Sequence, residues 1–323
     1  MPEDNITEKK AGGYLKRLIK LILFIAVVYF AGKQFVNNWS DVSGYDWDLN
    51  YIFLMLSFIF QLSTLILFSK SWCTVLDALG FEISLKQGFK ISYLANLGRY
   101  IPGKFWQIFG MIYLLKQINI GKKTAFTSWA LSWIYGIPPG LLLCGIAAFF
   151  YGDLLSELLG GIFNSDLYIA LFVFCVIALS VLFLFIPDYS IKFLNLILKL
   201  LKRDKIVFKF KKSMAIKVYS IYFISWINYG LAFYFLIRGL DSSSDVPFMV
   251  GLGSFVLAYL VGLLALFSPG GLGVRELILN SLLMPYFGPV AAGIVVAARV
   301  WSLVAEISAA GTALLLYVKD KRV

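Results

Sequence analysis

The sequence predicts an all-α polytopic membrane protein, and its composition and the length of its apolar runs are the observations that predict this class. Of its 323 residues, 60% are hydrophobic and 15% are charged, whereas a soluble domain averages roughly 45–50% apolar and about 25% charged residues. A water-soluble fold could not hide that much apolar surface. Several runs also reach the roughly 20 residues that a helix needs to cross the hydrocarbon core of a bilayer.

We expect about six spanning helices. The runs that qualify by length and composition are 18–36, 51–69, 124–150, 167–187, 217–237 and 290–317. The run at 18–36 has the basic start of a signal peptide, but no small-residue cleavage site follows it, so we expect an uncleaved first span. The predicted organisation is a cytoplasmic tail at 1–17, a single transmembrane domain at 18–317 and a second cytoplasmic tail at 318–323.

The charges between the apolar runs predict the orientation. Lys and Arg, which give the chain a net charge of +11, gather before the first, third and fifth runs and at the C-terminal end. The connections 38–50, 151–166 and 239–246 carry Asp or Glu and no Lys or Arg. Because basic connections stay in the cytoplasm, we expect a multi-pass protein of the inner (cytoplasmic) membrane with both termini cytoplasmic. The lysines of 192–217 suit topology control and anionic headgroups equally well, and nucleic acid is not an expected partner.

Two further apolar regions, 86–116 and 247–287, are interrupted by glycine and proline. Both flanks of the first are predicted to be cytoplasmic and both flanks of the second external, so each region must enter and leave the membrane on one side. We expect two oppositely oriented re-entrant hairpins in an inverted-repeat-like arrangement, since most of their arms are too short for full spans. The expected turn residues are Pro102 and Gly103 in the first hairpin and Pro269, Gly270, Gly271 and Gly273 in the second.

Charged side chains beside these breaks and within the last span are the candidate substrate-binding residues: Arg99, Lys104, Arg275, Glu276, Arg299 and Glu306. A charge at the bilayer centre costs about 2.5–3.5 kcal/mol by insertion scales, so such residues usually face the bundle interior. Pairing of Arg275 with Glu306 and of Arg299 with Glu276 is one interpretation, and Arg99 and Lys104 have no obvious acidic partner within the membrane. The surplus of cations over carboxylates suits an anionic group such as a lipid phosphate.

The segments NLGRYIPGKFWQ (Asn96–Gln107) and SPGGLGVRE (Ser268–Glu276), together with Arg299, resemble the signature of the lysylphosphatidylglycerol synthase transmembrane family, also called flippase-like. The resemblance covers nearly the whole chain. It implies a membrane domain that moves aminoacylated phosphatidylglycerol, polyprenyl-phosphate carriers or glycolipids between leaflets, and it assigns the hairpin residues named above to that task. The soluble aminoacyl-transferase domain of the bifunctional members does not follow the last span here, so synthesis of lysyl lipid is not expected.

The expected function is therefore ATP-independent movement of an anionic or lipid-linked headgroup, with membrane lipids as partners and without a cofactor or metal. The segment GRYIPGKF has the spacing of a phosphate-binding loop, but Phe105 stands where Ser or Thr must ligate magnesium. The absence of histidine excludes His-dependent zinc sites and triads. A membrane-embedded transferase with Glu276 or Glu306 as general base, or an accessory subunit of envelope glycoconjugate synthesis, is the alternative. An enzyme is not expected, and the sequence leaves a homo-oligomer open.

Overall fold

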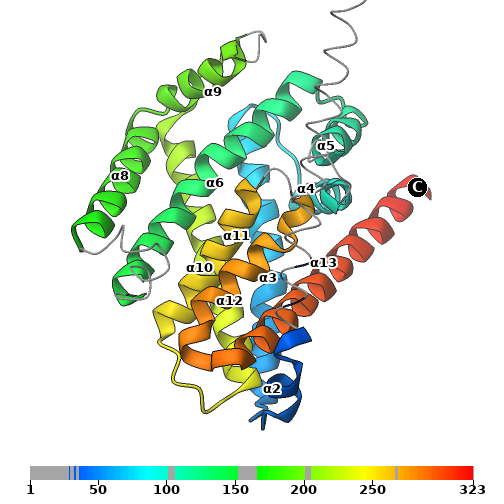
Figure 1. Cartoon of the computed structure of the whole chain (residues 1–323). Helices are drawn as coiled ribbons and strands as arrows, with labels where there is room; N and C mark the ends of the chain where they lie inside the picture. Colours follow the sequence, from blue (N-terminus) through cyan, green and yellow to red (C-terminus); the bar gives the residue numbers. More distant parts are fainter. Residues whose placement is uncertain are drawn as a thin grey trace, which may run out of the picture.

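The computed structural model describes residues 36–100, 106–151, 166–200, 205–265 and 268–322, together with residues 29 and 33. Within these ranges the chain forms helices and contains no β-strand (Figure 1). The elements are α2 (Trp39–Gly44), α3 (Tyr51–Ala78), α4 (Leu85–Asn96), η1 (Leu97–Tyr100), α5 (Trp106–Lys116), α6 (Lys122–Tyr151), α8 (Asp166–Phe185), α9 (Asp188–Leu200), α10 (Lys212–Leu240), α11 (Phe248–Leu264), η2 (Pro269–Gly271), α12 (Val274–Phe287), η3 (Gly288–Val290) and α13 (Ala291–Arg322).

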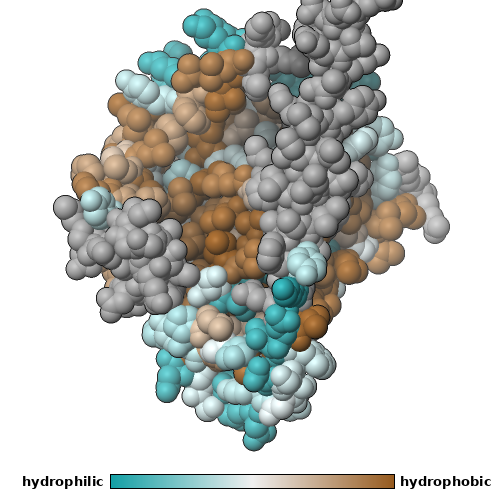
Figure 2. Space-filling view, viewed as in Figure 1, coloured by the Kyte–Doolittle hydropathy of each residue, from teal (hydrophilic) through white to brown (hydrophobic). Residues whose placement is uncertain are grey.

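The predicted class of helical membrane protein is confirmed. Helices α3, α6 and α10 and the stretch from α12 through α13 are long and apolar enough to cross a bilayer, and the bent pair α8–α9 adds a fifth candidate. Large apolar side chains on these helices point outward, among them Ile59, Phe174 and Ile307, which are 52%, 67% and 69% exposed. Figure 2 shows hydrophobic residues across the middle of the visible face and hydrophilic residues gathered below them, around α2. An apolar surface of this extent belongs in lipid. The expected first span at 18–36 lies largely outside the described residues.

Helices α3 and α10 form the antiparallel centre of the bundle (Figure 1). The start of α3 meets the end of α10, where the Asn50 backbone N–H donates to the Gly239 carbonyl at 2.9 Å. Halfway along, Asn228 Nδ2 donates to the Phe60 carbonyl at 2.8 Å, and Ser57 Oγ donates to a backbone carbonyl of α10 at 2.6 Å. Since the bilayer offers no water to such groups, these polar contacts fix how the two helices align.

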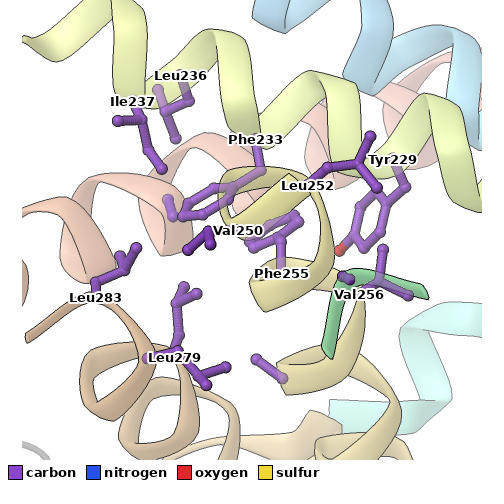
Figure 3. Close-up of a cluster of buried hydrophobic side chains, with 14 of the residues drawn as sticks. Tyr229, Phe233, Leu236, Ile237, Val250, Leu252, Phe255, Val256, Leu279 and Leu283 are labelled. Atoms are coloured by element: carbon purple, nitrogen blue, oxygen red, sulfur yellow. The ribbon is translucent and has the colours of Figure 1, made fainter. Parts of the chain in front are cut away.

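A cluster of buried apolar side chains fastens α11 and α12 to α10 (Figure 3). Phe233 of α10 and Phe255 of α11 stack with their ring centroids 4.4 Å apart and their planes within 5° of each other. Leu279 and Leu283 of α12 are buried in the same cluster. Between helices in lipid, close packing rather than exclusion of water supplies the attraction, so this cluster holds the second broken region in place.

Two pairs of shorter helices, α4–α5 (the first hairpin) and α11–α12 (the second hairpin), each contain a break and lie toward opposite ends of the bundle. The start of α4 lies beside the C-terminal end of α13, because Lys86 and Lys90 form ion pairs with Asp320 at 3.2 and 2.7 Å. At the other end of the molecule, η3, which follows α12, contacts α2. The arms of the first hairpin have 12 and 11 residues and those of the second 17 and 14. The two breaks, η1 and η2, contact each other inside the bundle.

The second break has a backbone that glycine makes possible. Gly270, Gly271 and Gly273 have φ angles of 59°, 73° and 80°, in the left-handed region that other residues avoid. A Cβ atom added at Gly271 would lie 3.1 Å from backbone atoms of Gly262 in α11. Ser268 Oγ donates to the Leu272 carbonyl at 2.6 Å and closes the turn. The turn predicted at Pro269 and its following glycines is therefore present.

At the first break, the predicted turn residues Pro102 and Gly103 lie outside the described residues, as does Lys104. Gly98 lies directly against the returning arm of this hairpin. A Cβ atom added at Gly98 would be 2.7 Å from the carbonyl carbon of Trp106. The backbone at Gly98 thus lies against the backbone at Trp106, and backbone atoms cannot move aside as a flexible side chain can.

Replacing Gly98 with Ala is expected to destabilise the folded chain by about 1–3 kcal/mol, because the added methyl group forces the two arms apart. The matched control is Gly121→Ala in the connection before α6, where an added Cβ meets nothing within 4 Å. In detergent, the midpoint of thermal unfolding should be lower for Gly98→Ala than for the unaltered chain, and it should be unchanged for Gly121→Ala. Equal midpoints for the two variants would contradict the close approach.

The basic connection after α8 contains a helix that the search for apolar runs did not predict. The predicted span 167–187 corresponds to α8, and α9 then turns away from it by 105°. With 13 residues, of which Asp188, Lys192 and Lys199 are charged, α9 is too short and too polar to register as a span.

Candidate functional site

Arg275 lies at the start of α12, immediately after the second break, and is 5% exposed. Its guanidinium carbon is 4.3 Å from the ring centroid of Phe255, 5.3 Å from that of Tyr259 and 5.9 Å from that of Tyr229. Its Nη2 also donates to Ser302 Oγ at 3.4 Å. Aromatic faces attract a cation without neutralising it, so this box holds Arg275 while its positive charge stays available.

Glu276 and Arg299 form an ion pair that ties α12 to α13. Arg299 Nε lies 3.4 Å from Glu276 Oε1, and Glu276 Oε2 accepts a hydrogen bond from the Gly273 N–H at 2.6 Å. A carboxylate in the first turn of a helix is also favoured by the helix dipole. The predicted pairing of Arg299 with Glu276 is confirmed, and it braces the second break.

Arg99 and Glu306 form an ion pair that ties η1 to α13. The prediction that Glu306 pairs with Arg275 is wrong, as is the prediction that Arg99 has no acidic partner. Arg299 and Glu306 share one face of α13 but lie two turns, about 10 Å, apart. The first hairpin enters from the end where α13 finishes, so its tip reaches Glu306. The second enters from the end where α13 begins, and it reaches Arg299.

A cavity of about 370 Å³ lies between the two breaks. The sequence-predicted residues that line it are Arg99, Arg275, Arg299, Glu306, Gly270 and Gly271. The structure thus brings together candidates from both hairpins and from α13. Glu276 lies beside this cavity, at a void of about 10 Å³ that it shares with Arg275 and Arg299. The described lining carries three arginines and one glutamate, so its net charge is positive.

The aromatic wall of the cavity was missed by the sequence analysis. It consists of Trp129 and Trp133 from α6, Tyr222, Trp226 and Tyr229 from α10, and Tyr259 from α11, with Phe68 from α3 and Tyr93 from α4. On α10 the aromatic residues follow one another at spacings of four and three, and on α6 the pair at a spacing of four is followed after three residues by Gly136. Such spacing places side chains on one helix face, and the repeated stripe is the signal that would have found them.

Polar side chains complete the lining. Gln61 of α3 is buried at the cavity, and Gln107 Nε2 donates to Asn96 Oδ1 across the two arms of the first hairpin. Trp129 Nε1 is buried with no hydrogen-bond partner among the described residues. A buried indole N–H usually has an acceptor. This donor is therefore available to a ligand atom, beside a cationic wall and several flat apolar surfaces.

Comparison with known proteins gives one family. Residues 17–310 match the family model described as the lysylphosphatidylglycerol synthase TM region. This range includes both hairpins, α13 as far as Glu306, and every residue that lines the cavity. No curated protein matches the chain.

Proposed function

Because the chain belongs to the lysylphosphatidylglycerol synthase transmembrane family, we propose that it moves a lipid with an anionic headgroup from one leaflet of the bilayer to the other without ATP. One observation carries this proposal: a net-positive cavity lies where two hairpins from opposite ends of the bundle meet. A site at such a meeting point is within reach of both leaflets, as in transporters built from oppositely oriented repeats.

The size of the cavity supports a headgroup as the occupant. Its volume of about 370 Å³ is near the lower end of the roughly 300–1,000 Å³ that small-ligand sites span. A phosphate-containing headgroup fits such a volume, and the acyl or prenyl tails stay in the surrounding lipid. Arg275 supplies the planar donors that bind phosphate in pairs. Aminoacyl-phosphatidylglycerol and polyprenyl-phosphate carriers, including glycolipids linked through polyprenyl phosphate, share this phosphate, and both classes are candidates.

The membrane placement is part of the proposal. We place α4–α5 and α11–α12 as re-entrant hairpins of opposite sense, with the run 18–36 as a further span and the tails 1–17 and 318–323 in the cytoplasm. The end of the bundle that carries α2 then lies on the external, non-cytoplasmic side of the inner membrane. The distribution of basic and acidic connections supports this orientation.

The contacts that Glu276 and Glu306 make within the protein favour transport over membrane-embedded transferase chemistry. Glu276 is engaged by Arg299 and by a backbone N–H, and Glu306 is engaged by Arg99. A carboxylate held in this way is poorly placed to take a proton from a substrate. We therefore propose that these residues position the hairpins and that the chain catalyses no covalent step.

Reconstitution into liposomes tests the proposal. Fluorescent phosphatidylglycerol labelled on its acyl chain is incorporated into both leaflets, and dithionite then bleaches whatever reaches the outer leaflet. With purified chain and no nucleotide, we expect bleaching to proceed beyond the outer-leaflet fraction seen in protein-free vesicles. If the chain moves neither phosphatidylglycerol nor a polyprenyl-phosphate probe, the proposal is overturned and the transferase or accessory function is favoured.

A further inference from the structure

Helix α9 runs nearly at right angles to α8. The bend between them is 105°, and it follows a helix whose outward side chains are apolar, including Phe174 at 67% and Phe185 at 57% exposure. Because α8 has 20 residues, about 30 Å, and carries mainly apolar side chains, we place it across the bilayer. A helix perpendicular to it lies along the membrane surface.

The side chains of α9 divide into three faces at 100° per residue. The buried face packs toward α6 and the segment that follows α9, and it consists of Ser190, Ile191, Leu194 and Leu198. The second face is apolar and exposed, and it consists of Tyr189, Phe193, Leu196, Ile197 and Leu200. Lys192 and Lys199 lie on the third face, beside the apolar one and clear of the buried one. This division is typical of helices that lie in a membrane interface.

The segment after α9 extends its basic face. Asn195 binds the backbone of Ile206 twice, since its Nδ2 donates to the carbonyl and its Oδ1 accepts from the N–H, each at 2.8 Å. Around this anchor, within 205–211, the exposed residues are Lys205, Val207, Lys209 and Lys211, and Lys212 begins α10. Within 188–212 the sequence offers Asp188 and Asp204 as the only acidic residues. The surface is therefore strongly positive.

We infer that α9 and residues 205–212 form an interfacial platform that gathers anionic phospholipids in the adjoining leaflet. The exposed apolar face enters the acyl region, and the neighbouring lysines meet headgroups. At the corner between α8 and α10, Lys212 Nζ lies 4.1 Å from the Phe185 ring centroid and Lys192 Nζ lies 4.6 Å from that of Tyr189. Amphipathic lysine stems of this kind reach from apolar surroundings to the headgroup level. Each lysine near an anionic membrane surface strengthens the binding of the protein to that surface about fivefold.

The depth of α9 is tested first, using the full chain. Cys175 is exposed while Cys73 and Cys144 are buried, so Cys175→Ser leaves no exposed cysteine among the described residues. A fluorophore is then attached through Leu196→Cys on the apolar face. Nitroxide labels high on the acyl chains should quench it strongly, whereas aqueous iodide should quench it weakly. The reverse pattern would place α9 in water and overturn the inference.

Selectivity for anionic lipid is tested with a fluorophore attached through Val207→Cys, a position 96% exposed among the lysines. Nitroxide-labelled phosphatidylglycerol should quench it at least about twofold more than the same label on phosphatidylcholine. High salt should remove this preference because it screens exposed charges. Replacing Lys192, Lys199 and Lys209 together with Gln should remove it too.

The matched control replaces Lys116, Lys122 and Lys123 with Gln, which makes the same change of charge at exposed lysines at the end of α5 and the start of α6. This control variant should retain the preference for phosphatidylglycerol. The inference would be overturned if labelled phosphatidylglycerol and labelled phosphatidylcholine quenched the unaltered platform equally. It would also be overturned if both triple variants lost the preference for phosphatidylglycerol to the same extent. Neither fluorescence measurement depends on lipid movement, so this inference and the proposed transport fail separately.

Discussion

Replacing Arg275 with Gln is expected to slow the movement of an anionic lipid about ten- to hundredfold. A charge-assisted contact with phosphate contributes about 1.5–3 kcal/mol, and its loss at the site of passage appears directly in the rate. The fold should survive, because Arg275 is held by three aromatic rings and Ser302 and its removal strands no ion-pair partner among the described residues. The measurement is the initial bleaching rate of labelled phosphatidylglycerol, normalised to protein that elutes as a single folded species.

Two further variants sharpen this experiment. Arg275→Lys keeps the charge but loses the planar fork of donors, so we expect a rate between those of the unaltered chain and Arg275→Gln. Lys123→Gln removes an exposed charge away from the cavity and should leave the rate unchanged. An unchanged rate in folded Arg275→Gln would remove this residue from the pathway.

Reversing one charge of the Arg99–Glu306 pair is expected to have the largest effect on stability. Arg99→Glu sets two carboxylates against each other between η1 and α13, where the paired side chains are 22% and 17% exposed. Breaking a fully buried pair costs about 3–5 kcal/mol, and we expect a loss below that range because both side chains keep some exposure. The double variant Arg99→Glu with Glu306→Arg should recover much of that loss, since it restores opposite charges at the same contact. Thermal unfolding in detergent measures both effects.

The matched control lies on the same two segments of chain. Lys86 of α4 pairs with Asp320 of α13, but these side chains are 53% and 38% exposed, and exposed pairs contribute at most about 1 kcal/mol. Lys86→Glu should therefore change the unfolding midpoint little. If Arg99→Glu is no worse than Lys86→Glu, or if the double variant recovers nothing, the pair does not hold the first hairpin to α13.

The helical class and the two breaks could be predicted from the sequence because the bilayer restricts what the backbone can do. Apolar runs of spanning length have to be helical there, since every backbone N–H and C=O needs a partner within the protein. The segment 269–273 predicts a turn because glycine readily takes the positive φ angles that Gly270, Gly271 and Gly273 show in the structure. The charges that flank the two breaks predict hairpins of opposite sense in the membrane.

Helix α9 and the aromatic wall escaped prediction for a different reason. A criterion based on length and hydropathy finds segments that cross the membrane, and α9 lies along its surface with lysines on one face. In the sequence, Trp226 is an ordinary apolar residue of a predicted span, Tyr259 lies in an arm of the second predicted hairpin, and Trp129 lies near a predicted membrane interface. Their shared cavity arises only when α6, α10 and α11 converge on the two breaks.

Arg299 and Glu306 can be placed on one face of the last helix from their positions in the chain, because a separation of seven residues is two helical turns. Which partner each of them meets depends on how the helices pack. That choice depends on how far each hairpin reaches along α13 and from which end, and both are set by packing between segments distant in the chain. Arg99 therefore binds Glu306, Glu276 binds Arg299, and Arg275 is left among aromatic rings with its charge facing the cavity.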